Sequence, residues 1–371
     1  MKIICLKENL VQGSQIAQRC VSSRAPLPVL NGILLTAHDN YLTFQATDLD
    51  LAIECSLPAE VITEGTVVVP ARHFSDIVRR LPNQNITLEY NSELRLLTLS
   101  YASAQFSINT YNADEFPNLP SKPETPNIEI AQELLKKIIN QVAFAASTDP
   151  IRPIFTGVFM EIANDHLLFV ATDTHRLAKR STGNCKIIDI DTLSQTIIPA
   201  RALTELNRLI TDEDTLLRIS INANNISFYT DEFFFYTKPI QGLYPDHQKV
   251  LPTNFQNQLN VDIDNILPSI ERAALLVSAK DGNSIVHFDI NDENLIINSV
   301  SADLGSVHEE ISITNEGKEL NISFNTKYFL DILKNIDSEQ IIIKFSGHLS
   351  PCIITPVSEE EYLYLLLPVR N

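Results

Sequence analysis

The sequence predicts an α+β protein built from three copies of one unit, each with two helices packed on antiparallel sheet. The first observation is a repeated turn. Residues Phe169–Ala178 read as a strand, a tight polar turn and a second strand, and related segments occur at 44–52 and 297–304. Their aspartates fall at near-even intervals: Asp48, Asp173 and Asp303. A turn repeated in this way indicates an internal repeat, which determines the architecture.

The second observation is helical periodicity. Each copy contains two segments in which apolar residues recur every three to four positions, as Leu10, Ile16 and Ala17 do in the first copy. A Pro-Ala-Arg triplet begins the second helix of copies one and two, and Asn325 is predicted to cap that helix in copy three. The predicted helical segments are 8–24, 71–81, 132–146, 200–210, 264–280 and 325–336.

Alternating apolar and polar residues predict the strands that close each copy. These strands are predicted at 86–111, 216–237 and 341–368. Stretches rich in proline and polar residues, at 121–127 and 253–257, are predicted linkers. The expected domains are residues 1–124, 125–252 and 253–371.

The formal net charge is −18, which by itself argues against nucleic acid as a partner. In the six helical segments, however, Lys and Arg outnumber Asp and Glu, so the rest of the chain is more acidic still. Basic residues are good helix formers, which explains any one helix. Six such helices favour a mildly basic surface that contacts a polyanion through its phosphates, weakly and without sequence preference.

The five cysteines are scattered and show no Cys-x-x-Cys spacing, so we expect free thiols in a reducing compartment. The N-terminus lacks the apolar run of a signal peptide, and no window has the length and hydropathy of a membrane span. We therefore expect a cytoplasmic protein without a membrane partner.

Asp173, His175 and Arg176 form the cluster that most resembles a catalytic site. A hydrolase built around Asp173 and His175 is one alternative, and a protein-only scaffold of three repeats is another. The sequence has no Gly-x-Ser-x-Gly elbow, no His-x-x-x-His pair and no Gly-rich phosphate loop. Copies one and three keep the aspartate and lose the His-Arg pair, so an aspartate that accepts backbone N–H groups explains the motif better. We predict no catalytic residue, no metal and no cofactor. His175 and Arg176 are either a site added to the middle copy or drift on a surface turn.

Together, four strings in this sequence resemble the bacterial DNA polymerase III β subunits, the replicative sliding clamps, and the resemblance extends over the whole chain. The strings are Ser23–Leu30, Ala171–Ala178, Tyr244–Asp246 and Tyr362–Arg370. The resemblance implies the DNA clamp fold, in which each subunit forms half of a closed ring with helices inside and sheets outside. It also implies a non-catalytic, head-to-tail homodimer that encircles double-stranded DNA and binds the replicative polymerase, the clamp loader and other proteins with a clamp-binding motif.

The resemblance also assigns residues. The implied pocket for partner peptides is formed by Phe155, Thr172, His175, Arg176, Leu177, Pro245, Lys249, Val250, Asn325, Tyr328, Leu349, Leu365, Leu367, Pro368, Val369 and Arg370. Residues expected to face DNA, from the resemblance or the helix charges, are Arg24, Arg72, Arg79, Arg80, Lys136, Lys137, Arg152, Arg201 and Arg208. The implied dimer interface places Phe106 against Leu275 and Leu276.

Four positions depart from the usual family residues. Thr174 stands where glycine is frequent, and Lys249 stands where arginine is common. Pro153-Ile154 replaces a frequent aromatic pair, and Asn371 replaces an apolar terminal residue. These departures concern the rim of the pocket and one DNA contact.

Overall fold

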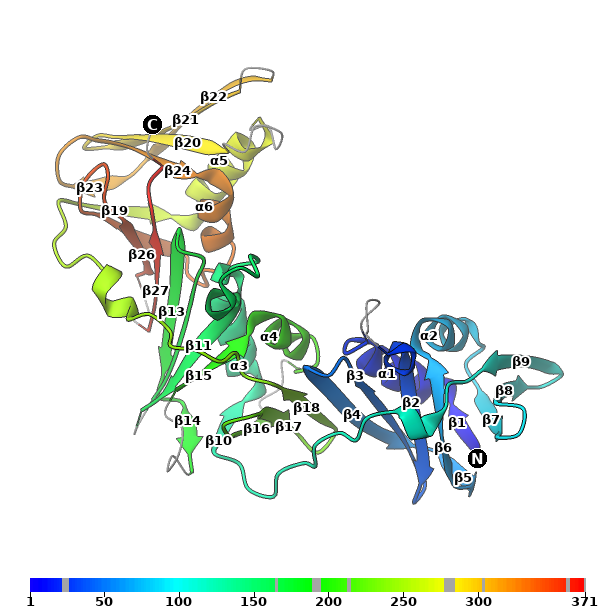
Figure 1. Cartoon of the computed structure of the whole chain (residues 1–371). Helices are drawn as coiled ribbons and strands as arrows, with labels where there is room; N and C mark the ends of the chain where they lie inside the picture. Colours follow the sequence, from blue (N-terminus) through cyan, green and yellow to red (C-terminus); the bar gives the residue numbers. More distant parts are fainter. Residues whose placement is uncertain are drawn as a thin grey trace. The chain divides into compact units, whose positions relative to one another are not determined.

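The computed structural model describes residues 1–21, 27–163, 166–188, 195–211, 215–276, 284–301, 304–357 and 361–369 (Figure 1). The chain forms two compact units. The first contains Met1–Glu133, Lys186–Leu193 and Arg208–Pro239, and the second contains Leu134–Cys185, Ser194–Asn207 and Ile240–Asn371.

Six α-helices occur in these described residues, at the six places predicted from periodicity. They are α1 (Lys7–Gln18), α2 (Ala71–Arg80), α3 (Gln132–Val142), α4 (Ala200–Asn207), α5 (Ile263–Leu275) and α6 (Thr326–Leu333). The predicted cap of the last helix is confirmed, because the Asn325 side-chain oxygen accepts a hydrogen bond of 3.1 Å from the backbone N–H of Tyr328. Short 3₁₀ turns include η3 (Ala143–Ala145), η4 (Pro153–Thr156) and η5 (His247–Val250).

The first unit contains two antiparallel sheets. Their strand orders are β5-β1-β7-β8-β9 and β14-β10-β16-β17-β18-β4-β3-β2-β6. The strands are β1 (Lys2–Leu6), β2 (Gly32–His38), β3 (Tyr41–Thr47), β4 (Leu51–Pro58), β5 (Glu60–Thr63), β6 (Gly65–Pro70), β7 (Asn85–Asn91), β8 (Leu96–Tyr101), β9 (Ala104–Asn109), β10 (Ile128–Ala131), β14 (Cys185–Ile187), β16 (Leu216–Ile221), β17 (Ile226–Tyr229) and β18 (Phe233–Thr237).

The second unit repeats this plan with a nine-stranded and a four-stranded sheet. Their strand orders are β15-β11-β12-β13-β27-β26-β25-β19-β23 and β22-β21-β20-β24. The strands are β11 (Gly157–Ile162), β12 (Leu167–Thr172), β13 (Arg176–Thr182), β15 (Gln195–Pro199), β19 (Asn257–Asp262), β20 (Ile285–Ile290), β21 (Asn294–Ser301), β22 (Gly305–Ser312), β23 (Thr314–Glu316), β24 (Leu320–Asn325), β25 (Gln340–Phe345), β26 (Cys352–Pro356) and β27 (Tyr362–Leu366).

Each nine-stranded sheet joins two successive copies of the repeat. In the first unit, β18 of copy two pairs with β4 of copy one, and Phe233 lies opposite Cys55. In the second unit, β27 of copy three pairs with β13 of copy two, and Leu365 lies opposite Leu177. In both cases the last strand of one copy pairs with the strand that follows the repeated turn in the copy before it.

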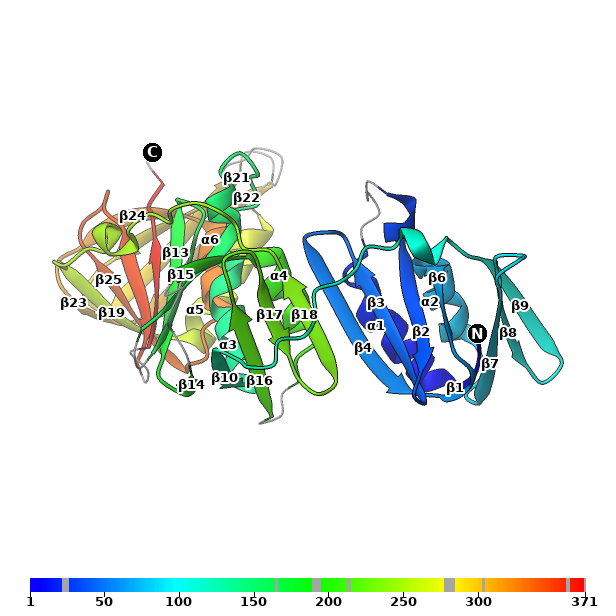
Figure 2. The ribbon, with the colours of Figure 1, turned by 60° about the horizontal axis from the view of Figure 1, so that its bottom comes forward.

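Helices α1 and α2 pack on one face of the sheet formed by β2, β3 and β4 (Figure 2). The buried residues of α1 are Leu10, Gly13, Ser14 and Ala17. Gly13 allows the helix to approach β3 closely, since a Cβ atom there would lie 2.4 Å from the ring of Phe44. Within the described residues, none of the five cysteines takes part in a disulfide.

Candidate functional site

The repeated turn is held by its own side chains. Thr172 Oγ1 donates a hydrogen bond of 2.6 Å to the carbonyl of Arg176 and accepts one of 3.1 Å from the N–H of Thr174. Asp173 Oδ1 accepts from the N–H groups of His175 and Arg176, at 2.9 and 3.0 Å. Thr174 takes a φ of 78°, a left-handed conformation that β-branched residues rarely adopt.

The first copy builds the same turn with its own Thr-Asp pair. Thr47 Oγ1 donates to the carbonyl of Leu51 at 2.7 Å and accepts from the N–H of Leu49 at 3.0 Å. Asp48 Oδ1 accepts from the N–H groups of Asp50 and Leu51. Leu49 has a φ of 81°. The interpretation of the aspartate as a turn-building residue is therefore confirmed in two copies, and Asp303 of the third lies outside the described residues.

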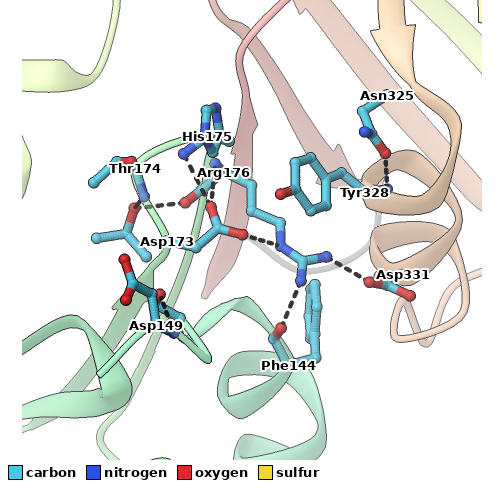
Figure 3. A network of polar contacts seen from close by, with 11 residues as sticks. Phe144, Asp149, Asp173, Thr174, His175, Arg176, Asn325, Tyr328 and Asp331 are labelled. Atoms are coloured by element: carbon cyan, nitrogen blue, oxygen red, sulfur yellow. Dashed lines mark hydrogen bonds and ion pairs between the residues drawn. The ribbon is translucent and has the colours of Figure 1, made fainter. Parts of the chain in front are cut away.

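Arg176 is buried at the centre of a polar network (Figure 3). Its side chain is 7 % exposed, and its Nε lies 3.1 Å from Asp173 Oδ2. Nη1 lies 2.6 Å from Asp331 Oδ2, and Nη2 donates to the carbonyl of Phe144 at 2.9 Å. The guanidinium also lies 4.5 Å from the centre of the Tyr328 ring. Three acceptors and this ring compensate for the burial of the charge.

An apolar pocket of about 210 Å³ lies beside this turn. Its lining residues are Phe155, Thr172, Thr174, Arg176, Leu177, Tyr244, Pro245, Asp246, His247, Val250, Pro351, Leu365 and Leu367. Eight of these were predicted, and they come from β12, β13, η4, η5, β27 and the segments next to them. The pairing of β13 with β27 places Leu177 opposite Leu365, so the pocket depends on the joint between copies two and three.

The other predicted pocket residues that the structure describes do not line the pocket. The His175 ring stacks on the Tyr328 ring at 5.9 Å between centres, and Asn325 caps α6. Lys249 pairs with Asp246 at 3.4 Å, and Leu349 is exposed. The N–H groups of Leu367 and Val369 donate to the carbonyls of His175 and Ser323, so Pro368 lies on a segment held at both ends. Arg370 lies outside the described residues.

Tyr244 and His247 are lining residues that the sequence reasoning missed. The Tyr244 ring stacks on Phe159 at 5.1 Å and meets Phe155 edge-on at 6.1 Å. Burial raises the pKa of the Tyr244 hydroxyl. Burial, and then the positive charge of Lys179, lower the pKa of His247, which favours a neutral imidazole. The signal for them in the sequence was their position, since both lie within two residues of the predicted residue Pro245.

The basic residues predicted to face DNA are mostly exposed. Arg72, Arg79, Arg80, Arg152, Arg201 and Arg208 are exposed, whereas Lys136 and Lys137 are half-buried. Arg79 pairs with Asp76 at 2.8 Å, and Lys137 pairs with Asp337 at 2.8 Å. Part of the positive charge on the helices is therefore neutralised locally. Arg24 lies outside the described residues.

A second hollow, of about 480 Å³, runs along α1 in the first unit. Basic side chains line it together with amides: Lys7, Arg19 and Arg208 with Gln12, Gln15 and Asn83. Glu8 also lines it and accepts a hydrogen bond of 2.7 Å from Asn83. The hollow combines positive charge with hydrogen-bond donors, as phosphate contacts require.

Two of the three residues predicted for a dimer interface are exposed. Phe106 is 40 % exposed on β9, an end strand of its sheet, and stacks on Tyr101 at 6.3 Å. Leu275 is 77 % exposed at the end of α5, and Leu276 follows it half-buried. No helix found among the described residues combines the length and the apolar character needed to span a membrane.

Comparison with known proteins gives one consistent result. Family models of the DNA polymerase III β subunit match residues 1–120 with its N-terminal domain, 129–246 with its central domain and 248–370 with its C-terminal domain. The beta sliding clamp of Bacillus subtilis is 36 % identical, with 100 % of each chain covered.

Solved structures agree with this match. The crystal structure of the DNA polymerase sliding clamp from Bacillus subtilis has a TM-score of 0.94 at 35 % identity, covering 100 % of this chain and 99 % of that chain. The DnaN sliding clamp from Pseudomonas aeruginosa bound to griselimycin has a TM-score of 0.92 at 28 % identity, with 100 % of both chains covered.

Proposed function

Because the chain belongs to the family of bacterial DNA polymerase III β subunits, the sliding clamps, we propose that two copies close head to tail around duplex DNA and hold partner proteins in the pocket beside Arg176. Its function is that of the family, a non-catalytic processivity factor of DNA replication. The observation that carries the proposal is the pocket, which two copies of the repeat build together. We further propose that it acts in the cytoplasm, with domain boundaries after residues 124 and 252.

The strand pairing between successive copies of the repeat supports the proposed ring closure. Inside the chain, the last strand of one copy pairs with the strand after the turn of the previous copy, as β18–β4 and β27–β13 do. The last strand of copy one is β9 and the strand after the third turn is β22, and each ends its sheet in the described chain. Pairing of β9 with β22 of a second subunit would complete the series head to tail. Phe106 on β9 and Leu275 at the end of α5, which contacts β22, fit such an interface.

The oligomeric state tests this part of the proposal. We expect light scattering to give a mass near twice 41.6 kDa. Phe106→Glu should give a folded monomer, because a charge would be buried in the interface. As a control, Leu216→Glu places the same charge on a surface leucine of β16 that is not assigned to any interface. A wild-type monomer at micromolar concentration would contradict ring closure.

The proposed contact with DNA is loose and made to phosphates. The candidates are the exposed arginines of the helices and the hollow along α1. An encircling ring needs no tight contact, so a net charge of −18 does not exclude it. We expect the protein, once loaded, to stay on nicked circular DNA and to leave when the circle is cut. Equal retention on both would indicate ordinary binding.

The proposed ligands of the pocket are short, partly apolar peptides from the replicative polymerase, the clamp loader and other proteins with a clamp-binding motif. Leu177, Val250 and Leu367 offer apolar surface for such side chains. Phe155→Ala should weaken binding of a fluorescein-labelled polymerase peptide at least tenfold, as truncation of an aromatic anchor does. Leu216→Ala is the matched control and should leave this affinity unchanged.

A further inference from the structure

The side chain of Arg176 joins three segments that are far apart in the sequence. In Figure 3 the turn between β12 and β13 faces α6 across this side chain. The guanidinium bonds to Asp173 in the turn, to Asp331 on α6 and to the carbonyl of Phe144 in η3. A planar guanidinium presents its donors in a fixed fork, so the three acceptors are held in fixed relative positions.

Two of the three segments carry walls of the pocket. The turn and its flanking strands contribute Thr172, Thr174 and Leu177. The segment after Phe144 leads to Phe155, whose carbonyl accepts a hydrogen bond of 2.8 Å from the N–H of Ser147. Helix α6 contributes no lining residue within the described chain, so it influences the pocket through the segments that it contacts, which include the turn and β27.

The contact between Asp331 and Arg176 is the charged connection from α6 to the turn. Its length is 2.6 Å, and the partner arginine is almost fully buried while the Asp331 side chain is 32 % exposed. Charge-assisted bonds of this kind are short and strong, and a buried cation that loses one partner tends to shift towards another acceptor or water. Loss of the Asp331 charge should therefore loosen the guanidinium, and with it the turn and the Phe144 carbonyl.

We propose that Asp331 is a positioning residue of the pocket, which fixes Arg176 and through it the walls that hold a partner peptide. This inference rests on the proposed role of the pocket in peptide binding. It makes peptide affinity depend on a side chain, Asp331, that does not line the pocket. By thermodynamic linkage, a bound peptide also stabilises the contact between Arg176 and Asp331.

The test measures binding of the fluorescein-labelled polymerase peptide to the full-length protein at 25 °C by anisotropy. Asp331→Asn keeps the shape and removes the charge, and we expect affinity to fall about five- to tenfold. Asp331→Glu keeps the charge and should recover most of the affinity. Asp337→Asn is the matched control, since Asp337 pairs with Lys137 at 2.8 Å but is 72 % exposed. It should bind like the wild type, because exposed ion pairs contribute little.

A double-mutant cycle separates positioning from general stability. If Asp331 acts through Arg176, Asp331→Asn should have no further effect on affinity in an Arg176→Met background. An undiminished effect in that background would overturn the inference, and so would wild-type affinity of Asp331→Asn while Phe155→Ala fails to bind. If the wild-type protein itself does not bind the peptide, the proposed role of the pocket fails and this inference fails with it.

Discussion

Thr174 is the residue at which the structure makes its sharpest prediction about stability. Its φ of 78° places a β-branched residue in left-handed backbone, which costs about 1–2 kcal/mol relative to an unstrained conformation. Glycine adopts this conformation without that cost. However, glycine gives the unfolded chain more conformational entropy, which lowers the free energy of unfolding by about 0.4–1 kcal/mol. We therefore expect Thr174→Gly to raise the free energy of unfolding by about 0.5–1 kcal/mol. For a unit of this size, that corresponds to an increase of about 1–3 °C in Tm.

The assay is thermal unfolding of the full-length protein followed by circular dichroism or calorimetry. Thr174→Ala is the matched control, because alanine removes the side chain but keeps a Cβ atom in the same backbone conformation. The free energy of unfolding of the glycine variant should be about 1 kcal/mol higher than that of the alanine variant, since only glycine relieves the strain. If the two variants unfold at the same temperature, Thr174 carries no strain and the reasoning is wrong.

Three further predictions concern other parts of the chain. Burial lowers the folded-state pKa of His247, so the unfolded chain takes up the proton first as pH falls below about 6.5, and the free energy of unfolding should decrease there. His247→Gln should reduce this decrease, as denaturant titrations at pH 7.5 and 5.5 would show. Gly13→Ala should destabilise by about 1–3 kcal/mol through contact with Phe44, and Phe44→Leu should partly rescue it in chemical unfolding. Binding to linear DNA should weaken steeply between about 50 and 200 mM salt, whereas retention of the loaded protein on closed circles should change little, as gel filtration at each salt concentration would show.

The architecture could be predicted from the sequence because its determinants are local. The spacing of Leu10 and Ala17 defines a helical face, and Asp48 and Asp173 form their turns with N–H groups two and three residues away. Such interactions depend on neighbours along the chain, so a repeated pattern predicts a repeated structure. The pairing between copies was outside this reasoning, because it depends on register between distant strands.

The site was predicted less completely, because it too depends on the pairing of strands that are distant in the sequence. Leu177 and Leu365 meet only because β13 and β27 pair in one register, and the resemblance, rather than any local pattern, brought both into the predicted set. Arg176 was expected to form part of the pocket, and the structure shows in addition that its guanidinium bonds to Asp173, Asp331 and Phe144. A side chain that satisfies acceptors from three distant segments cannot be distinguished in the sequence from one that faces solvent.

The strand pairs β18–β4 and β27–β13 have a consequence for assembly. In each of them the polypeptide itself supplies the partner, so the local concentration of the second strand is fixed and does not depend on how much protein is present. A third pair of this type, formed between two subunits, would have no covalent link between its strands. The fraction of such pairs that is formed would therefore depend on protein concentration, unlike that of the pairs within one chain. An oligomer that contains both kinds of strand pair would therefore separate first at the contacts between chains, and no subunit would have to unfold for it to open.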